Sequence, residues 1–267
     1  MAHHDRVVVT GACGRVGREV TRAVIKSPDL SLVGAVDIVH IGEDIGNVLG
    51  LGNKDIIVSP NLEEVIKKAS PDILVDFTHA RAGGENIKTA LRLGVSVVSG
   101  TTGFFREQIE EIALLAQKQE IGAVIAPNFA LGAILMIRFA QEAARWFSEA
   151  EIIELHHQEK LDAPSGTALR TARLICQEWE TRGVLPKPKD KKEERARGYQ
   201  ELEVPIHSVR LLGLIAHQEV IFGLAGQTLT LRHDSISRES FVPGVMLAIR
   251  RVKSLRGVVF GLENLLD

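Results

Sequence analysis

Short apolar runs alternate with segments of helical spacing through the first half of the chain. The runs are rich in valine and isoleucine and end in glycine or polar residues. Strands are predicted at residues 6–10, 32–36, 56–58, 73–77, 95–98 and 123–126. Strands that alternate with helices indicate an α/β fold with a doubly wound parallel sheet, because parallel neighbours need long crossover connections.

The segments between these strands carry apolar stripes that predict helices. In the first of them, Val20, Ala23 and Val24 share one face. Asn61 suits the start of the second, because its side chain can accept a hydrogen bond from the first turn. The helices predicted after the first are residues 62–70, 86–93 and a long one that ends near residue 120; residues 41–54 predict a glycine-containing loop with a short helix.

The pattern changes after about residue 128. A helix over 131–147 precedes an alternating strand at 151–155, and another helix ends near residue 181. Three β-rich runs follow, at residues 204–211, 219–224 and 228–232, with residues 225–227 joining the last two as a hairpin. The apolar run Val220-Ile221-Phe222 suggests burial on both faces of that sheet.

Parallel βα units followed by a mainly antiparallel segment indicate two domains. We expect residues 1–127 and 240–267 to form the first, with a helix at 241–253 that returns to it. Residues 128–239 then form a smaller α+β domain. Residues 187–197 mix Lys, Arg and Glu, which predicts a solvated loop rather than a nucleic-acid patch.

A glycine-rich turn separates the first predicted strand from the first helix. Its residues are Gly11, Ala12, Cys13, Gly14, Arg15, Val16 and Gly17. Glycines allow a tight turn and close approach of the backbone to a pyrophosphate, whose charge suits a helix N-terminus. Asp37 follows the next strand, 20 residues beyond Gly17, where an acid can bind ribose hydroxyls. The spacing G-x-x-G-x-x-G differs from G-x-G-x-x-G, so a plain βαβ turn is the alternative to dinucleotide binding.

Other polar or glycine-rich segments follow later strands. They include Phe77-Thr78-His79, then Gly100, Thr101 and Thr102, and finally Ala126, Pro127, Asn128 and Phe129. The carboxyl ends of parallel strands share one edge of a sheet, where ligands collect. Each segment alone is explained by a turn, but together they can line one crevice.

The stretch after the strand at 151–155 carries the most chemistry. His156, His157 and Lys160 precede Ser165, Gly166 and Thr167, which begin a helix. An ammonium and helix N–H groups hold carboxylates, and a histidine exchanges a proton near neutral pH. This pattern suits an anionic substrate that must receive a proton. The alternative is polar surface followed by an ordinary helix entry.

Composition excludes several classes of function. A net charge of −2 and an aromatic content of 4% argue against nucleic-acid partners and acidic membranes. The longest apolar segment, residues 122–140, is interrupted by Pro127 and Asn128, so no membrane span is expected. The two cysteines lack metal-ligand spacing, and no metal site is expected. With no secretory signal visible, we expect a cytoplasmic protein, in which Cys13 is a small residue rather than a redox sensor.

These motifs resemble the dihydrodipicolinate reductase family, also called 4-hydroxy-tetrahydrodipicolinate reductases, of the diaminopimelate and lysine pathway. Residues 154–168 are close to a family signature. The glycine turn, Asp76-Phe77-Thr78, residues 100–103 and Asn128-Phe129 fall in the family's order and spacing. The resemblance implies a Rossmann-like domain completed by the C-terminal segment, and a substrate domain whose sheet builds a homotetramer.

The resemblance also implies residue roles. His156 would be the acid/base residue and Lys160 the proton donor for reduction of a conjugated cyclic imine. The dicarboxylate substrate would be bound by His157, Ser165, Gly166 and Thr167. NADH or NADPH would be bound by Gly11, Ala12, Cys13, Gly14, Arg15, Val16, Asp37, Gly100, Thr101, Thr102, Ala126, Pro127, Asn128 and Phe129.

Two features depart from some family members. Ile38 and Val39 follow Asp37, whereas some relatives place an arginine there for the 2′-phosphate of NADPH, so NADH is favoured. Arg15 or His40 can instead supply a cation for the 2′-phosphate, so the use of both NADH and NADPH stays open. The residues Ala216-His217-Gln218-Glu219 also differ from the Gly-Glu-His order of other members, and we assign His217 no role.

Two other functions remain open from the sequence. A different nicotinamide-dependent reductase, such as an amino-acid dehydrogenase, would share the dinucleotide domain but is not expected to carry the His-His-x-x-Lys and Ser-Gly-Thr arrangement. A non-enzymatic dinucleotide sensor would need no proton donor.

Overall fold

The computed structural model describes residues 4–184 and 196–266. It divides into two compact units, Met1–Ala130 with Arg238–Asp267, and Leu131–Ser237. The loop predicted at residues 187–197 lies, except for its last two residues, outside the described residues.

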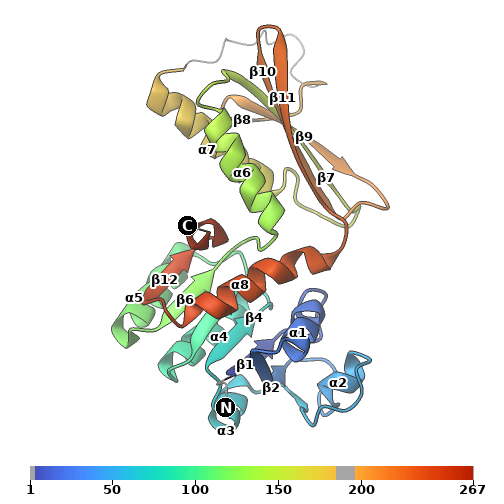
Figure 1. The fold of residues 1–267 in the computed structure, drawn as a ribbon, viewed down its shortest axis with the longest axis vertical. Coiled ribbons are helices and arrows are strands. Elements are labelled where there is room, and N and C mark those ends of the chain that lie inside the picture. Colours follow the sequence, from blue (N-terminus) through green and yellow to red (C-terminus); the bar gives the residue numbers. More distant parts are fainter. Residues whose placement is uncertain (1–3, 185–195, 267) are drawn as a thin grey trace. The chain divides into compact units, whose positions relative to one another are not determined.

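The first unit is built on a seven-stranded parallel sheet of order β12-β6-β5-β4-β1-β2-β3 (Figure 1). Its strands are β1 (Asp5–Thr10), β2 (Leu30–Val36), β3 (Val58–Ser59), β4 (Ile73–Asp76), β5 (Ser96–Ser99), β6 (Gly122–Ile125) and β12 (Gly257–Phe260). The predicted parallel sheet is confirmed. β12 was not predicted, because its four residues pair with a strand far away in the sequence.

Helices pack on both faces of this sheet. They are α1 (Gly17–Lys26), α2 (Ile45–Val48), α3 (Leu62–Ala69), α4 (Ala80–Arg92), α5 (Arg106–Gln119) and α8 (Val242–Val252), with the 3-10 turns η2 (Arg238–Phe241) and η3 (Leu262–Leu265). The helices α1 and α8 pack together on one face, and α3, α4 and α5 on the other (Figure 1). Strands covered on both faces are mainly apolar, and β4, β5 and β6 are buried at every position, including their polar residues Asp76, Ser96 and Ser99.

The start of α4 corrects the sequence prediction. The helix begins at Ala80 rather than near Asn86, and Nδ1 of His79 accepts from the backbone N of Ala82 at 3.4 Å. The first turns of α4 were not predicted because they contain Gly83 and Gly84, and glycine disfavours helix. Gly83 is nevertheless suited to its place, because a Cβ there would lie 2.9 Å from Oδ2 of Asp76.

The second unit contains a five-stranded mixed sheet of order β11-β10-β7-β9-β8. Its strands are β7 (Glu149–His156), β8 (Tyr199–Glu201), β9 (Val204–Arg210), β10 (Ala216–Leu224) and β11 (Gln227–Ser235). The strands β7 and β9 are parallel, and the other neighbours are antiparallel. The helices α6 (Leu131–Ala143) and α7 (Gly166–Arg182) pack on this sheet, beside each other (Figure 1). The short strand β8 was not predicted.

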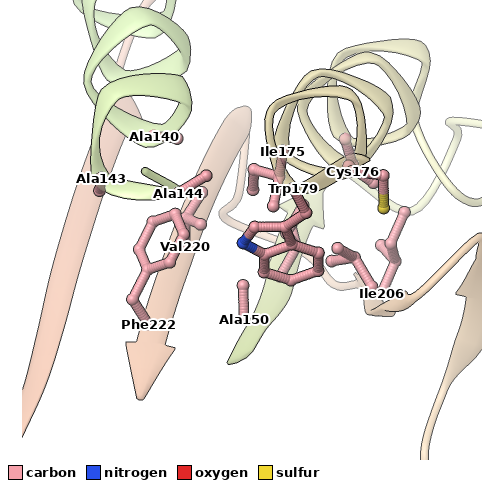
Figure 2. Close-up of a cluster of buried hydrophobic side chains, with 14 of the residues drawn as sticks. Ala140, Ala143, Ala144, Ala150, Ile175, Cys176, Trp179, Ile206, Val220 and Phe222 are labelled. Carbon is pink, nitrogen blue, oxygen red and sulfur yellow. The ribbon is translucent and has the colours of Figure 1, made fainter. Parts of the chain in front are cut away.

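The hydrophobic core of the second unit lies between its sheet and these two helices (Figure 2). Val220 and Phe222 are fully buried there, whereas Ile221 points to the opposite face and is half-buried. Burial on both faces is therefore not complete within one chain. Trp179 of α7 is 2% exposed, and its Nε1 donates to the carbonyl oxygen of Phe147 at 2.7 Å.

Candidate functional site

The glycine turn after β1 is shaped by close backbone contacts. Gly11 has a φ of +70°, and a Cβ on it would overlap the carbonyl of Phe77. A Cβ on Gly17 would overlap the carbonyl of Gly11. Gly17 opens α1, whose N-cap is Val16, a residue with no side-chain acceptor for the first turn. A tight loop followed by an N-terminus without a side-chain cap fits a pyrophosphate.

Asp37 lies against this turn. Its Oδ2 accepts from the backbone N of Cys13 at 2.8 Å, and its Oδ1 accepts from the N of Ile38 at 2.7 Å. Oδ1 also accepts from the N of Val39 at 3.3 Å. These bonds hold the carboxylate at the end of β2, and Oδ2 keeps a lone pair for a ribose hydroxyl. The Asp37 carboxylate therefore fits a dinucleotide with free ribose hydroxyls.

Arg18 is a cation at this site that sequence reasoning missed. Its Nε donates to the carbonyl of Cys13 at 2.8 Å, and its Nη2 lies 3.3 Å from Nε2 of His40. The available signal was its place directly after Gly17 in the sequence. Arg18 thus supplies a cation beside the turn, whereas Ile38, directly after Asp37, is apolar and 80% exposed.

Cys13 is buried inside the turn. Burial and the neighbouring charge of Asp37 raise the pKa of the Cys13 thiol to about 11. The thiol therefore stays protonated at neutral pH, which favours the structural role over redox sensing.

The ends of β1, β4 and β5 are joined by the buried carboxylate of Asp76. It accepts hydrogen bonds from the side chains of Thr10, Thr78, Asn86, Ser99 and Thr101. Neutral donors around a carboxylate fix the strand ends relative to one another. Sequence reasoning found Asp76 only as part of a motif; the missed signal was an acid ending an apolar strand, with hydroxyl residues ending its neighbours.

The later predicted cofactor segments meet through two aromatic rings. Phe77 and Phe129 lie with ring centroids 5.8 Å apart. A Cβ on Gly100 would overlap the ring of Phe77, so this position requires glycine. The remaining predicted residues follow β5 and β6: Thr101 and Ala126 are buried, Asn128 is half-buried, and Thr102 and Pro127 are exposed.

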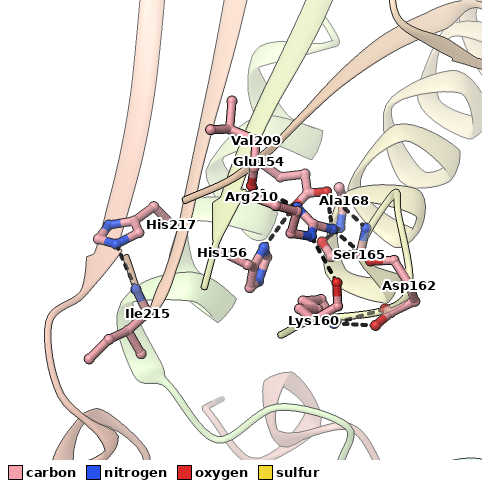
Figure 3. Close-up of polar contacts among 10 residues, drawn as sticks. All are labelled: Glu154, His156, Lys160, Asp162, Ser165, Ala168, Val209, Arg210, Ile215 and His217. Atoms are coloured by element: carbon pink, nitrogen blue, oxygen red, sulfur yellow. Dashed lines mark hydrogen bonds and ion pairs between the residues drawn. The ribbon is translucent and has the colours of Figure 1, made fainter. Parts of the chain in front are cut away.

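In the second unit, β7 ends at His156. Nδ1 of His156 contacts Oε2 of Glu154, which lies two residues earlier on the same strand face (Figure 3). The imidazole is 14% exposed and Glu154 is fully buried. Arg210 of β9 contacts the same carboxylate, with Nη2 donating to Oε1 at 2.8 Å.

Lys160 lies in the turn after β7. Its backbone N donates to the carbonyl of His157 at 3.1 Å, and its Nζ lies 2.7 Å and 2.8 Å from the two carboxylate oxygens of Asp162. The ammonium holds the pKa of Asp162 below its ordinary value. His157 is half-buried just beyond the strand.

Ser165 begins α7 as predicted. Its Oγ accepts from the backbone N of Ala168 at 3.2 Å, and its own N donates to Oε1 of Glu154 at 3.3 Å. Gly166 is exposed, and a Cβ there would meet no atom within 4 Å. The structure thus brings His156, Lys160 and the start of α7 together around Glu154 and Arg210, two residues for which no role was predicted.

Within residues 4–184 and 196–266, no group of three His, Cys, Asp or Glu side chains is placed to hold a metal ion. In the same ranges, no helix is long and apolar enough to cross a membrane.

Known proteins match this chain over nearly its whole length. The family model for the N-terminus of dihydrodipicolinate reductase matches residues 5–129, and the model for its C-terminus matches residues 132–266. The 4-hydroxy-tetrahydrodipicolinate reductase of Moorella thermoacetica is 53% identical over 98% of both chains. That of Thermosynechococcus vestitus is 50% identical over 97% of this chain and 96% of its own.

The comparison with solved structures gives the same family. A dipicolinate-bound dihydrodipicolinate reductase from Paenisporosarcina has a TM-score of 0.83 and 41% identity, and the match covers 98% of this chain and 100% of that one. An amine dehydrogenase from Mycobacterium smegmatis has a TM-score of 0.66 at 15% identity, which shows a shared fold alone. The resemblance found in the sequence motifs is confirmed: the chain belongs to the dihydrodipicolinate reductase family.

Proposed function

We propose that this protein is a cytoplasmic NAD(P)H-dependent reductase of 4-hydroxy-tetrahydrodipicolinate, or its dehydrated form, yielding tetrahydrodipicolinate in diaminopimelate and lysine biosynthesis. The observation that carries the proposal is the family match over both units, together with the cluster of His156, Lys160 and the start of α7.

Each unit contributes its own part of the reaction. A bound nicotinamide dinucleotide supplies the hydride. The first turn of α1 and Asp37 hold its pyrophosphate and ribose, and residues after β5 and β6 hold the remainder. Reduction of the imine puts negative charge on the substrate. The His156 imidazolium and the Lys160 ammonium would stabilise this charge, and one of them would supply the single proton that neutralises it.

Substrate binding requires two separate anion sites. Thr167 and the N–H groups near Gly166 bind one carboxylate, because a helix N-terminus favours an anion by hydrogen bonding and by its dipole. His157 and Lys160 bind the other, with the substrate carboxylate replacing Asp162 as the partner of the ammonium.

The deciding experiment is a reductase assay with purified protein. The substrate is generated from aspartate semialdehyde and pyruvate, and oxidation of NADH or NADPH is followed. Steady turnover is expected. Binding of the dinucleotide without turnover would indicate a sensor, and turnover with 2-oxo acids and ammonia instead would indicate an amino-acid dehydrogenase.

Cofactor preference is a further prediction. We expect kcat/KM with NADH to equal or exceed that with NADPH, because Asp37 accepts from ribose hydroxyls but repels a 2′-phosphate. Asp37→Asn should move the ratio towards NADPH, and Arg18→Gln should lower the use of NADPH more than that of NADH. A strong preference of the unmodified protein for NADPH would contradict this electrostatic argument.

Recognition of two carboxylates is tested by inhibition. Pyridine-2,6-dicarboxylate should compete with substrate, and pyridine-2-carboxylate should bind about 5- to 150-fold more weakly, since an unpaired buried polar site costs roughly 1–3 kcal/mol. Thr167→Val should weaken the diacid. Thr181→Val, a matched change on an exposed part of the same helix, should not. Equal inhibition by both acids would remove the second carboxylate site.

We also propose a homotetramer assembled through the β-rich region of the second unit. Among the described residues, helices cover one face of its sheet, while Ile153, Leu155 and Ile221 lie half-buried on the other. Light scattering should give the mass of four chains for the unmodified protein and a lower mass for Ile221→Glu. Leu114→Glu, at an exposed position of α5, is the control. A monomer at micromolar concentration would exclude the assembly.

A further inference from the structure

Glu154 is a fully buried carboxylate to which the proposed substrate-binding groups are tied. Its Oε2 contacts Nδ1 of His156 and accepts from Nη1 of Arg210 at 3.0 Å. Its Oε1 accepts from Nη2 of Arg210 at 2.8 Å and from the backbone N of Ser165 at 3.3 Å. Ser208 of β9 also hydrogen-bonds to this carboxylate. Donors from His156, Arg210 and Ser165 therefore converge on one side chain, between the end of β7 and the start of α7 (Figure 3).

Arg210 extends this arrangement to the turn that carries Lys160. Its Nε donates to the carbonyl of Lys160 at 3.3 Å, and its Nη2 donates to the carbonyl of Asp162 at 2.6 Å. A guanidinium presents its donors in a rigid plane. One side chain thus holds the Lys160 turn at a set distance from Glu154.

The ionisation of Glu154 determines which His156 nitrogen carries the proton. Burial alone would raise the pKa of Glu154, but hydrogen bonds from His156 and Arg210 outweigh it and lower the pKa to about 2. An ionised carboxylate only accepts, so its contact with Nδ1 requires a proton on that nitrogen. In the neutral ring, Nε2 is then the nitrogen without a proton.

We propose that Glu154 is a positioning residue: it fixes the orientation and tautomer of His156 so that Nε2 exchanges the proton with substrate, and through Arg210 it holds the turn that carries Lys160. The inference rests on the proposed function and adds the residue that assembles its proton-transfer groups.

A second histidine–glutamate pair on the same sheet shows what distinguishes this one. Nε2 of His207 lies 2.9 Å from Glu151, but Glu151 is 33% exposed on the opposite face. Glu154 is instead fully buried, and a buried ion pair adds little to stability compared with a hydrophobic residue. Stability alone is thus a weak reason for a buried glutamate at this position.

The first experiment determines the tautomer in the unmodified protein. Selective ¹⁵N labelling of histidine and long-range ¹H–¹⁵N correlation distinguish Nδ1–H from Nε2–H, and His156→Gln identifies the signal of His156. We expect the neutral ring of His156 to carry its proton on Nδ1. A predominant Nε2–H form would overturn the proposal, whatever the behaviour of any variant.

The second experiment uses Glu154→Gln. An amide has one acceptor oxygen and an NH₂ group, so the donors that face the NH₂ group lose their acceptor. We expect kcat to fall by about 10²-fold, as for a reacting group displaced by about 1 Å, while the Kd for NADH stays within about twofold. The Nδ1–H form should also lose its predominance. Glu149→Gln, the same change at an exposed position of β7, should alter neither.

The outcomes separate the possible failures. Unchanged kcat in Glu154→Gln, with His156→Ala impaired, would overturn the positioning role while leaving the proposed function intact. An unmodified protein that turns over no substrate would instead overturn the proposed function. If Glu154→Gln does not fold, the tautomer in the unmodified protein decides the inference.

Discussion

His156→Ala and Lys160→Ala should each lower kcat by about 10²–10⁴-fold, the usual cost of losing a general acid. Both side chains lie in the second unit, around Glu154 and Arg210, whereas the glycine turn and Asp37 lie in the first. The Kd for NADH should therefore stay nearly unchanged. Steady-state kinetics and fluorescence titration with NADH measure the two effects separately.

Matched controls are available for both changes. His207 is paired with Glu151 on the same sheet, and Lys67 is paired with Glu63 on α3. His207→Ala and Lys67→Ala should retain kcat close to that of the unmodified protein. Turnover near the normal level in both His156→Ala and Lys160→Ala would exclude these residues from the mechanism.

Trp179→Ala should lower the free energy of unfolding of the second unit by about 3–5 kcal/mol. The indole is the largest side chain in that core, and its removal leaves a cavity beside Ile175 and Ile206 (Figure 2). It also removes the hydrogen bond to the carbonyl of Phe147. The chain's two tryptophans, Trp146 and Trp179, both lie in this unit, so fluorescence during urea denaturation reports on it selectively.

Trp146→Ala is the corresponding control. This indole is 70% exposed, and Cζ of Arg182 lies over it, 5.8 Å from the centroid of the indole ring. Its loss should cost less than about 1 kcal/mol, the usual size of an exposed cation–π contact. Equal losses in the two variants would mean that Trp179 does not anchor the core.

Elements with a regular local pattern were predictable. The strands β4 and β5 contain the apolar runs Ile73-Leu74-Val75 and Val97-Val98, because helices cover both faces of their sheet. The cap of α3 was also predicted, since Oδ1 of Asn61 accepts from the N of Glu64 at 3.2 Å. In each case the residues that decide the structure are neighbours in sequence.

Other elements depend on distant partners. β8 and β12 are short, and each exists because a longer strand lies beside it. Gly83 resembles a helix breaker in sequence, yet it lies inside α4 because the helix packs closely against Asp76. Local propensity disfavours both features, and tertiary contacts outweigh it.

The candidate site shows the same division. The sequence by itself determined the glycine turn, the family motifs and the alternation of strands and helices along the first half of the chain, because these follow from local residue patterns. Only the tertiary structure placed Arg18 beside the carbonyl of Cys13, and Arg210 beside Glu154. In sequence Glu154 is one polar residue in an alternating strand. Its burial and its hydrogen-bond donors arise only when β7, β9 and the start of α7 come together, since burial and electrostatic partners are properties of the assembled fold.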